Sequence, residues 1–283
     1  MTTQPFPPSL SALFPNQETK QRRLSVRLPA GRVIRADGDF PVLWFSDQPA
    51  TADQFTRLLA GQPQSGLQPL LLDANYPDQD DYVPWGCGEL SPQRMTSPGH
   101  YVPAALLANW WQDYTEADEN DPASERDEVS EETAPFGRRW PGLAAPATPR
   151  AEPDALASEY AEVLLDRHPH LRLGLVAAPS AAHALTTTGW EGPTNYDNDT
   201  AKYSAVLGDW EQRFGARVVC VGSADLRLSV AAPPPDLGSA LLLAAEHFAC
   251  CPDNIWQGAK GARTLTAYAE GLIDCLEWAF WWD

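Results

Sequence analysis

The sequence predicts an α+β protein whose C-terminal half is a mixed sheet with flanking helices. A smaller, β-rich α+β half precedes it. Short apolar runs bounded by Gly or Pro, typical of buried strands, occur between longer stretches with apolar residues at helical spacing. Most of these helical stretches end at Gly or Pro, residues that commonly terminate helices. With 283 residues the chain is long enough to bury a sizeable core.

The first 112 residues divide into a lead-in and a β-rich region. Residues 1–20 are rich in Pro, Ser and Gln, so we expect an unstructured lead-in. Residues 21–112 form the predicted N-terminal α+β region. Its expected elements are a hairpin with strands at 23–28 and 32–35, buried strands at 41–45 and 67–72, a helix over 51–60 that stops at Gly61, and a helix over 104–111.

Residues 113–153 read as a linker that is first acidic and then rich in Pro and Ala. Residues 113–132 hold ten Asp or Glu and one Arg, which is half of the whole chain's net charge of −18. Such a run repels itself and offers little apolar surface, so we expect a solvated spacer. Phe136 and Trp140 are apolar enough to anchor the linker on a domain surface.

Residues 154–283 form the predicted C-terminal domain, with the element order α-β-α-α-β-β-α-α-β. One helix follows a cap at Asp199 and stops at Gly215; another follows Asp236 and stops at Pro252. The other elements are helices at 154–167, 181–188 and 264–273, a strand at 171–176, a hairpin with strands at 217–221 and 226–231, and a terminal strand at 276–283. That last segment alternates Leu276, Trp278, Phe280 and Trp282 with other residues, which predicts a strand, and we expect this strand to be central in the sheet.

Charge and cysteine content narrow the compartment and the partners. A net charge of −18 and a pI of about 4.5 argue against binding to nucleic acid or to an anionic membrane surface. An acidic surface suits a basic protein partner, although it also serves solubility alone. The sequence has no apolar run of membrane-spanning length and no secretory signal, and its five cysteines lack a disulfide-like spacing; these features favour the cytoplasm.

The motifs predict no cofactor and no metal ion. Gly86-Cys87-Gly88 lacks the third Gly and the strand-to-helix setting of a phosphate-binding loop. His168 and His170 form a pair without a third ligand nearby, and the chain has neither an HExxH motif nor a paired CxxC motif. The sequence also lacks the GxSxG elbow of a serine hydrolase.

One cluster of reactive residue types remains, at the end of the helix that stops at Pro252. Helical geometry places Glu246 and His247 on the flank of this helix, off its apolar stripe, while Cys251 and Asp253 follow at its exit. A Cys beside a His can be a nucleophile, because an imidazolium lowers the thiol pKa. These four residues are the candidate catalytic group. The structural alternative is a buried cysteine pair, with Asp253 capping the next turn.

Eleven Trp residues suggest either an aromatic core or an aromatic-lined ligand groove. The polar loop at 189–197 carries a Trp that looks exposed, which favours a binding edge, although a packed Ω-loop fits the same residues. The candidate binding residues are Trp190, Asn195, Trp210, Asn254 and Trp256.

Two blocks, at 209–219 and 244–256, carry a family signature. Together with segments at 172–178, 190–195, 228–234 and 278–283, they make the chain similar to a bacterial family of uncharacterised proteins. The C-terminal domain of that family has no assigned function, so the resemblance implies a cytoplasmic bacterial protein and no mechanism. This chain departs from the pattern at Cys250, where Phe is expected, and at Gln212, where Asp is expected.

Three functional hypotheses follow. The first is an acidic, soluble binding protein without catalysis, of which an immunity- or antitoxin-like protein that covers a basic toxin is one form. The second is a hydrolase or transferase that uses His247 with Glu246, Cys251 or Asp253. The third is a purely structural role for the signature residues. The sequence leaves the oligomeric state and the ligand open.

Overall fold

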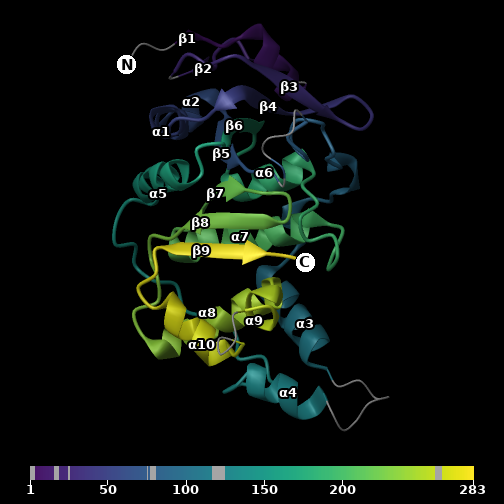
Figure 1. Ribbon diagram of the computed structural model, residues 1–283, viewed down its shortest axis with the longest axis vertical. Coiled ribbons are helices and arrows are strands. Elements are labelled where there is room, and N and C mark those ends of the chain that lie inside the picture. Colours follow the sequence, from purple (N-terminus) through teal and green to yellow (C-terminus); the bar gives the residue numbers. More distant parts are fainter. Residues whose placement is uncertain are drawn as a thin grey trace.

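The computed structural model describes residues 4–15, 19–24, 26–74, 76, 81–116, 125–258 and 263–283. Its centre is a seven-stranded mixed sheet with the strand order β3-β4-β6-β5-β7-β8-β9 (Figure 1). The protein is therefore α+β with helices flanking the sheet, as the sequence predicts. Among the residues described, no helix combines the length and apolarity that crossing a bilayer requires.

The two halves of the chain interleave in this sheet. The first half supplies β3 (Gly31–Ala36), β4 (Phe40–Pro49) and β5 (Leu67–Leu72), and the second supplies β6 (Arg172–Ala177), β7 (Arg217–Val221), β8 (Asp225–Ser229) and β9 (Glu277–Trp281). β6 lies between β4 and β5, and β5 lies between β6 and β7. Every neighbouring pair is antiparallel except β5 and β7, which run parallel. The carboxyl ends of β5 and β7 therefore meet at one edge of the sheet.

Each face of the sheet has its own apolar core. One core contains buried residues of α3 (Pro103–Thr115), α6 (Ala181–Thr188), α7 (Thr200–Phe214), α8 (Leu237–Cys250) and α10 (Leu265–Leu272). The other contains residues of α1 (Ala52–Ala60), α5 (Pro153–Arg167) and the 3-10 helix η1 (Pro8–Leu13). The remaining elements are β1 (Gln4–Pro5), β2 (Arg23–Leu24), α2 (Gln62–Ser65), η2 (Pro92–Arg94), η3 (Pro98–His100), α4 (Glu125–Glu132) and α9 (Asp253–Trp256).

Local signals fix several helix ends where the sequence predicts them. The Asp199 side chain accepts a hydrogen bond from Ala201 N at the start of α7, and Asp236 accepts one from Ser239 N at the start of α8. Gly215 ends α7 in the left-handed region at φ 59°, which Gly adopts without a side-chain clash. These caps act within one helical turn, so they are readable from the sequence.

The N-terminal hairpin prediction is wrong. β3 pairs with β4, and the short β2 pairs with β1 instead. The hairpin turn lies at Asp37-Gly38-Asp39, where Gly38 and Asp39 have φ values of 78° and 65°. Asp-Gly is a strong signal for such a turn, and it outweighs the alternation further upstream. In the expected lead-in, η1 is ordered, because Leu10 and Leu13 are buried in the core.

The last strand is also not central: β9 is an edge strand, with only β8 beside it. Its inward side chains Trp278 and Phe280 are nevertheless buried. Side chains of the preceding helices cover the open edge, because Asn254 Nδ2 donates to the Ala279 carbonyl at 2.8 Å and Cys251 Sγ to the Trp281 carbonyl at 2.9 Å. Such coverage protects an edge strand from pairing with another chain.

The expected linker is partly ordered against the helices. Residues 117–124 of the acidic run lie outside the described residues, and the following part forms α4. Phe136 packs against the core, and the ring of Trp140 lies 5.6 Å from that of Trp111. Both aromatic residues therefore anchor this segment.

Candidate functional site

Glu246 of α8 is the centre of a buried hydrogen-bond network, and it does not lie on an exposed helix flank as expected. Its exposed fraction is 0%. Oε1 accepts hydrogen bonds from Ala144 N at 2.7 Å and Arg213 Nη1 at 3.0 Å, and Oε2 accepts them from Trp210 Nε1 at 2.8 Å and Arg213 Nη2 at 2.5 Å. Both oxygens are thus engaged by two donors each, so the carboxylate is not presented to a substrate.

Arg213 is the cation of this network. Burial by itself would lower the pKa of Arg213, but the hydrogen bonds and charges of Glu246 and Asp209 raise it. Asp209, one turn before Arg213 in α7, is a second carboxylate partner: its Oδ2 lies 2.5 Å from Arg213 Nη2. The buried carboxylate therefore has a charged partner, as buried charges require.

His247 lies in an aromatic cage, so the flank of α8 on which it was expected is covered by other side chains. It has no exposed surface, and its ring centroid lies 4.9, 4.6 and 4.8 Å from those of Trp210, Trp278 and Phe280. Burial, followed by the charge of Arg213, lowers the pKa of His247 to about 3. The imidazole is therefore neutral at physiological pH.

Tyr268 links this imidazole to α9. The Tyr268 hydroxyl accepts a hydrogen bond from Asn254 Nδ2 at 3.0 Å and lies 3.0 Å from His247 Nδ1, a second hydrogen-bond contact. The other ring nitrogen of His247 is Nε2. That buried Nε2 has no hydrogen-bond partner within the described part of the chain. A neutral, enclosed imidazole of this kind has no path to a substrate in this conformation.

The remaining candidate catalytic residues hold the end of the sheet in place. Cys251 is buried, and burial raises the pKa of its thiol well above the ordinary value. Asp253 is buried and accepts hydrogen bonds from Gln257 Nε2 at 3.0 Å and from Asp283 N at 3.0 Å. The buried cysteine matches the structural alternative, but Asp253 does not cap the next turn: α9 begins after Pro252 without a side-chain cap, and Asp253 binds the C-terminal residue instead.

The candidate binding residues do not form one groove. Trp190 and Trp210 are fully buried, and Trp190 Nε1 donates to the Gly222 carbonyl at 2.8 Å. The expectation that Trp190 is exposed is therefore wrong, because the end of β7 lies over its loop. Trp256 is half-buried against Phe248, and Asn195 is exposed and donates to the Asp283 carbonyl.

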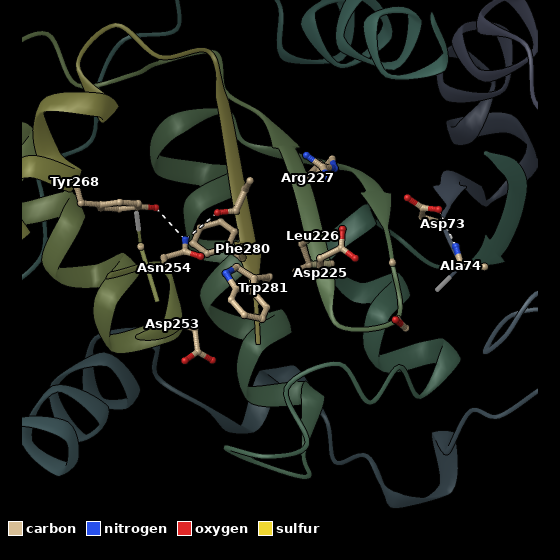
Figure 2. Close-up of a pocket in the computed structure, with 14 residues that line it drawn as sticks. Asp73, Ala74, Asp225, Leu226, Arg227, Asp253, Asn254, Tyr268, Phe280 and Trp281 are labelled. Atoms are coloured by element: carbon tan, nitrogen blue, oxygen red, sulfur yellow. Dashed lines mark hydrogen bonds between the residues drawn. The ribbon is translucent and has the colours of Figure 1, made fainter. Parts of the chain in front are cut away.

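A cavity of about 530 Å³ opens where the carboxyl ends of β5 and β7 meet the start of β8 and the end of β9, and two of the predicted site residues, Asp253 and Asn254, help to line it. In Figure 2, Trp281 stands in the middle of its wall, between Asn254 of α9 and Asp225 of β8, with Asp73 beyond Asp225. Trp281 is 41% exposed, although it is one of the largest side chains of the sheet. The cavity is also lined by Arg227 of β8.

The cavity is acidic. Burial raises the pKa of Asp225, and the charge of Asp73 raises it further, while Arg227 opposes both. Asp73 follows β5 directly, and its Oδ1 lies 2.9 Å from His170 Nε2. His170 thus pairs with Asp73, while the centroid of its ring lies 5.9 Å from that of His168 in an edge-to-face arrangement. Among the described residues, no cluster of three His, Cys, Asp or Glu could hold a metal ion.

The sequence analysis missed Asp73, Asp225 and Trp281. A usable signal was present, because Asp73 directly follows the buried run at 67–72, and sites in sheets of this kind often form at the carboxyl ends of parallel strands. Recognising it required knowing that β5 and β7 are parallel neighbours. Their pairing joins residues far apart in the chain, such as Leu71 and Cys220.

Comparison with known proteins identifies one domain. Residues 172–283 match a domain of unknown function, DUF4253, which spans β6 to the end of the chain. The match includes Asp225, Trp281, Arg213 and Glu246, but not β3, β4, β5 or Asp73. No curated protein and no solved structure matches the chain.

Proposed function

We propose that this protein is a binding protein without a catalytic step, which docks a basic protein partner at the acidic cavity beside Trp281. The observation that carries the proposal is the 41% exposed Trp281 in an open cavity of about 530 Å³, with the carboxylate of Asp225 beside it and that of Asp73 beyond. A Lys or Arg side chain of the partner is the group that these features suit best.

The physical case rests on two groups in the cavity and on the net charge of the chain. An indole face attracts a cation through its ring quadrupole, and Trp does so more strongly than the other aromatic residues. Asp225 is a carboxyl group whose desolvation raises its pKa, so an incoming cation stabilises its charged form. The net charge of −18 speeds the encounter with a basic protein and makes it sensitive to salt.

The surface around the cavity supports docking of a macromolecule. Alternate residues of β9, namely Glu277, Ala279 and Trp281, are exposed on the face opposite the aromatic core. Leu276, directly before β9, is 44% exposed. An exposed Trp and Leu beside charged groups resemble the aromatic centre and polar rim of an interface.

The proposal includes a bacterial cytoplasmic location and a basic toxin as one type of partner. All five cysteines are unpaired, which suits a reducing cytoplasm, and the resemblance of the sequence points to a bacterial source. An acidic protein that covers a basic toxin, as immunity proteins and antitoxins do, would use such a surface. The alternative of a hydrolase or transferase acting through His247 requires a conformation that opens the aromatic cage.

The test compares two cavity variants with two matched controls. Trp281→Ala and Asp225→Asn alter the cavity; Phe40→Ala removes another exposed aromatic ring, and Glu270→Gln removes another exposed carboxylate. The probe is a fluorescently labelled Arg-rich peptide, with binding followed by anisotropy at low and high salt. We expect each cavity variant to weaken binding about tenfold and the controls to leave it within about twofold.

The same four variants are then used to capture proteins from host lysate at low salt. A basic protein that binds the wild type and both controls, but neither cavity variant, supports the proposal. Equal loss of peptide binding in Glu270→Gln and Asp225→Asn would reduce the effect to net charge and would overturn the assignment of the site. Captured protein that is indifferent to all four substitutions would do the same.

A further inference from the structure

Residues 139–150, here called the strap, run between α4 and α5 without forming a helix or a strand. In Figure 1, α4 lies at the bottom of the view and α5 at the left, well above it, and the strap between them contacts α7 and α8 at Arg213 and Glu246. It lies outside the part of the chain that matches the domain of unknown function. Its contacts with that domain resemble those of a bound peptide more than those of a spacer.

Two charged side chains of the domain bind the main chain of Ala144 in the strap. Glu246 Oε1 accepts a hydrogen bond from Ala144 N at 2.7 Å, and Arg213 Nη1 donates one to Ala144 O at 2.9 Å. A buried carboxylate and a buried guanidinium thus bind the N–H and the C=O of the same residue. Both hydrogen bonds are charge-assisted, which makes them stronger than bonds between neutral groups.

Other residues hold this pair in position. Trp210 Nε1 donates to Glu246 Oε2 at 2.8 Å, and Arg213 Nε donates to Asp209 Oδ2 at 2.7 Å. The guanidinium also contacts both oxygens of Glu246, at 3.0 and 2.5 Å, in a fork that fixes the two planes relative to each other. The geometry that meets Ala144 is therefore preorganised by groups outside the strap.

The contacts on either side continue the same pattern. Ala147 N donates to the Arg213 carbonyl at 3.1 Å, and Arg150 N donates to the Ala231 carbonyl at 2.8 Å. Ala144 is buried at 5% exposure, whereas the next residue, Ala145, is exposed. Side chains of the strap also contact the rest of the protein, since Trp140 and Leu143 pack against the core. Main-chain hydrogen bonds that supply affinity, with side-chain contacts that add selectivity, are how proteins bind extended peptides.

The geometry points to a peptide-binding site in which Glu246 and Arg213 clamp the main chain of an extended segment, and residues 139–150 are its occupant in the intact chain. The strap is thereby a removable cover over Glu246, which is fully buried in this conformation. This inference is independent of the acidic cavity beside Trp281, because none of the residues that line that cavity belongs to the strap, and neither Glu246 nor Arg213 lines it.

The test converts the strap into a separate peptide. Protease sites are inserted after Gly137 and after Ala151, which is exposed, in the full-length protein. The two remaining parts stay associated, because β6 from one lies between β4 and β5 from the other. After cleavage, we expect the strap peptide to remain bound through gel filtration and to exchange with a labelled synthetic peptide of residues 138–151.

Matched peptides identify the clamp. A peptide with Ala144→Pro lacks the N–H that Glu246 accepts, whereas Ala145→Pro changes a neighbouring residue whose N–H makes no hydrogen bond within the described part of the chain. Since a hydrogen bond to a charged group is lost, the Ala144→Pro peptide should bind at least about tenfold more weakly, and the Ala145→Pro peptide within about threefold of the original. Equal binding of all three peptides would overturn the inference.

A second measurement covers the case in which the cleaved protein loses its fold. In the uncut chain, the amides of Ala144, Ala147 and Arg150 should exchange slowly and at similar rates, because the strap opens as one unit. The Ala145 amide should exchange fast. Exchange of the first three amides at the rate of the free peptide would show that the strap is not bound, and would equally overturn the inference.

Discussion

Replacing Glu246 by Gln should strongly destabilise this protein, although the two side chains have nearly the same size and shape. Each carboxylate oxygen accepts two hydrogen bonds, one of them from Arg213. Whichever oxygen becomes the amide NH₂ group then faces two donors, one from Arg213 and one from either Ala144 or Trp210. Rotation of the side chain cannot relieve this conflict, since both positions are equivalent in this respect.

The size of the effect follows from burial. Glu246 has no exposed surface and Arg213 is 10% exposed at its side chain, so the pair is not weakened by water. Removing one partner of a buried ion pair costs about 3–5 kcal/mol. Arg213 keeps Asp209, 2.5 Å away, so we expect the lower end, about 3 kcal/mol, which lowers Tm by about 6–12 °C.

Urea unfolding of Glu246→Gln, with Glu270→Gln as the exposed control, measures this difference. The control should stay within about 0.5 kcal/mol of the wild type. The slope of free energy against urea should not change, so that the shift in midpoint reports stability alone. A loss below about 1 kcal/mol for Glu246→Gln would refute the argument that the four hydrogen bonds are made to a charged, desolvated group.

Four other outcomes are expected. Deleting residues 278–283 removes the buried side chains of three aromatic residues, each worth about 3–5 kcal/mol, so fractionation after expression should find no soluble protein. The free energy of unfolding of the wild type should fall by up to about 5 kcal/mol between about pH 6.5 and pH 3, because in this range His247 takes up a proton only in the unfolded state. Urea midpoints of His247→Gln should lack this component of the pH dependence. Binding of the Arg-rich peptide should weaken on acidification, because the raised pKa of Asp225 lets it protonate early, and anisotropy of Asp225→Asn should lack that step. Maleimide labelling with mass spectrometry should modify exposed Cys87 in the native protein but not the buried cysteines.

Each of these has an outcome that contradicts it. Normal solubility of the truncated chain would mean that β9 is dispensable for the core. Parallel pH curves for wild type and His247→Gln would mean that His247 is protonated in the folded state. A peptide affinity that responds to pH identically with and without Asp225 would assign the effect to other carboxylates. Rapid labelling of Cys251 would show that the end of α8 opens in solution.

Sequence reasoning succeeded for features that depend on neighbours in the chain. The start of α7 at Asp199 and its end at Gly215 follow from a cap and a left-handed residue within one turn. The alternation of apolar residues near the end of the chain correctly predicted the terminal strand, observed as β9. The same alternation could not place β9 at the edge of the sheet, because alternation describes the faces of a strand and not its neighbours.

The candidate site shows where this reasoning stopped. Helical spacing put Glu246 and His247 on a flank, and a flank is exposed only if nothing covers it. In the folded chain, Ala144 of the strap covers Glu246, and Tyr268 of α10 covers His247. Those contacts join residues 102 and 21 positions apart, far beyond the reach of a helical repeat.

The sequence by itself determined the α+β class, most helix and strand positions in the C-terminal half and the acidic charge. These depend on side-chain periodicity, caps and composition, which act over a few residues or over the whole chain. Only the tertiary structure decided that β5 lies between β6 and β7, that His247 is a neutral core residue and that Trp281 faces solvent. Burial and protonation depend on which distant segments pack together, because the free energy of a charge or an apolar surface depends on what replaces water around it.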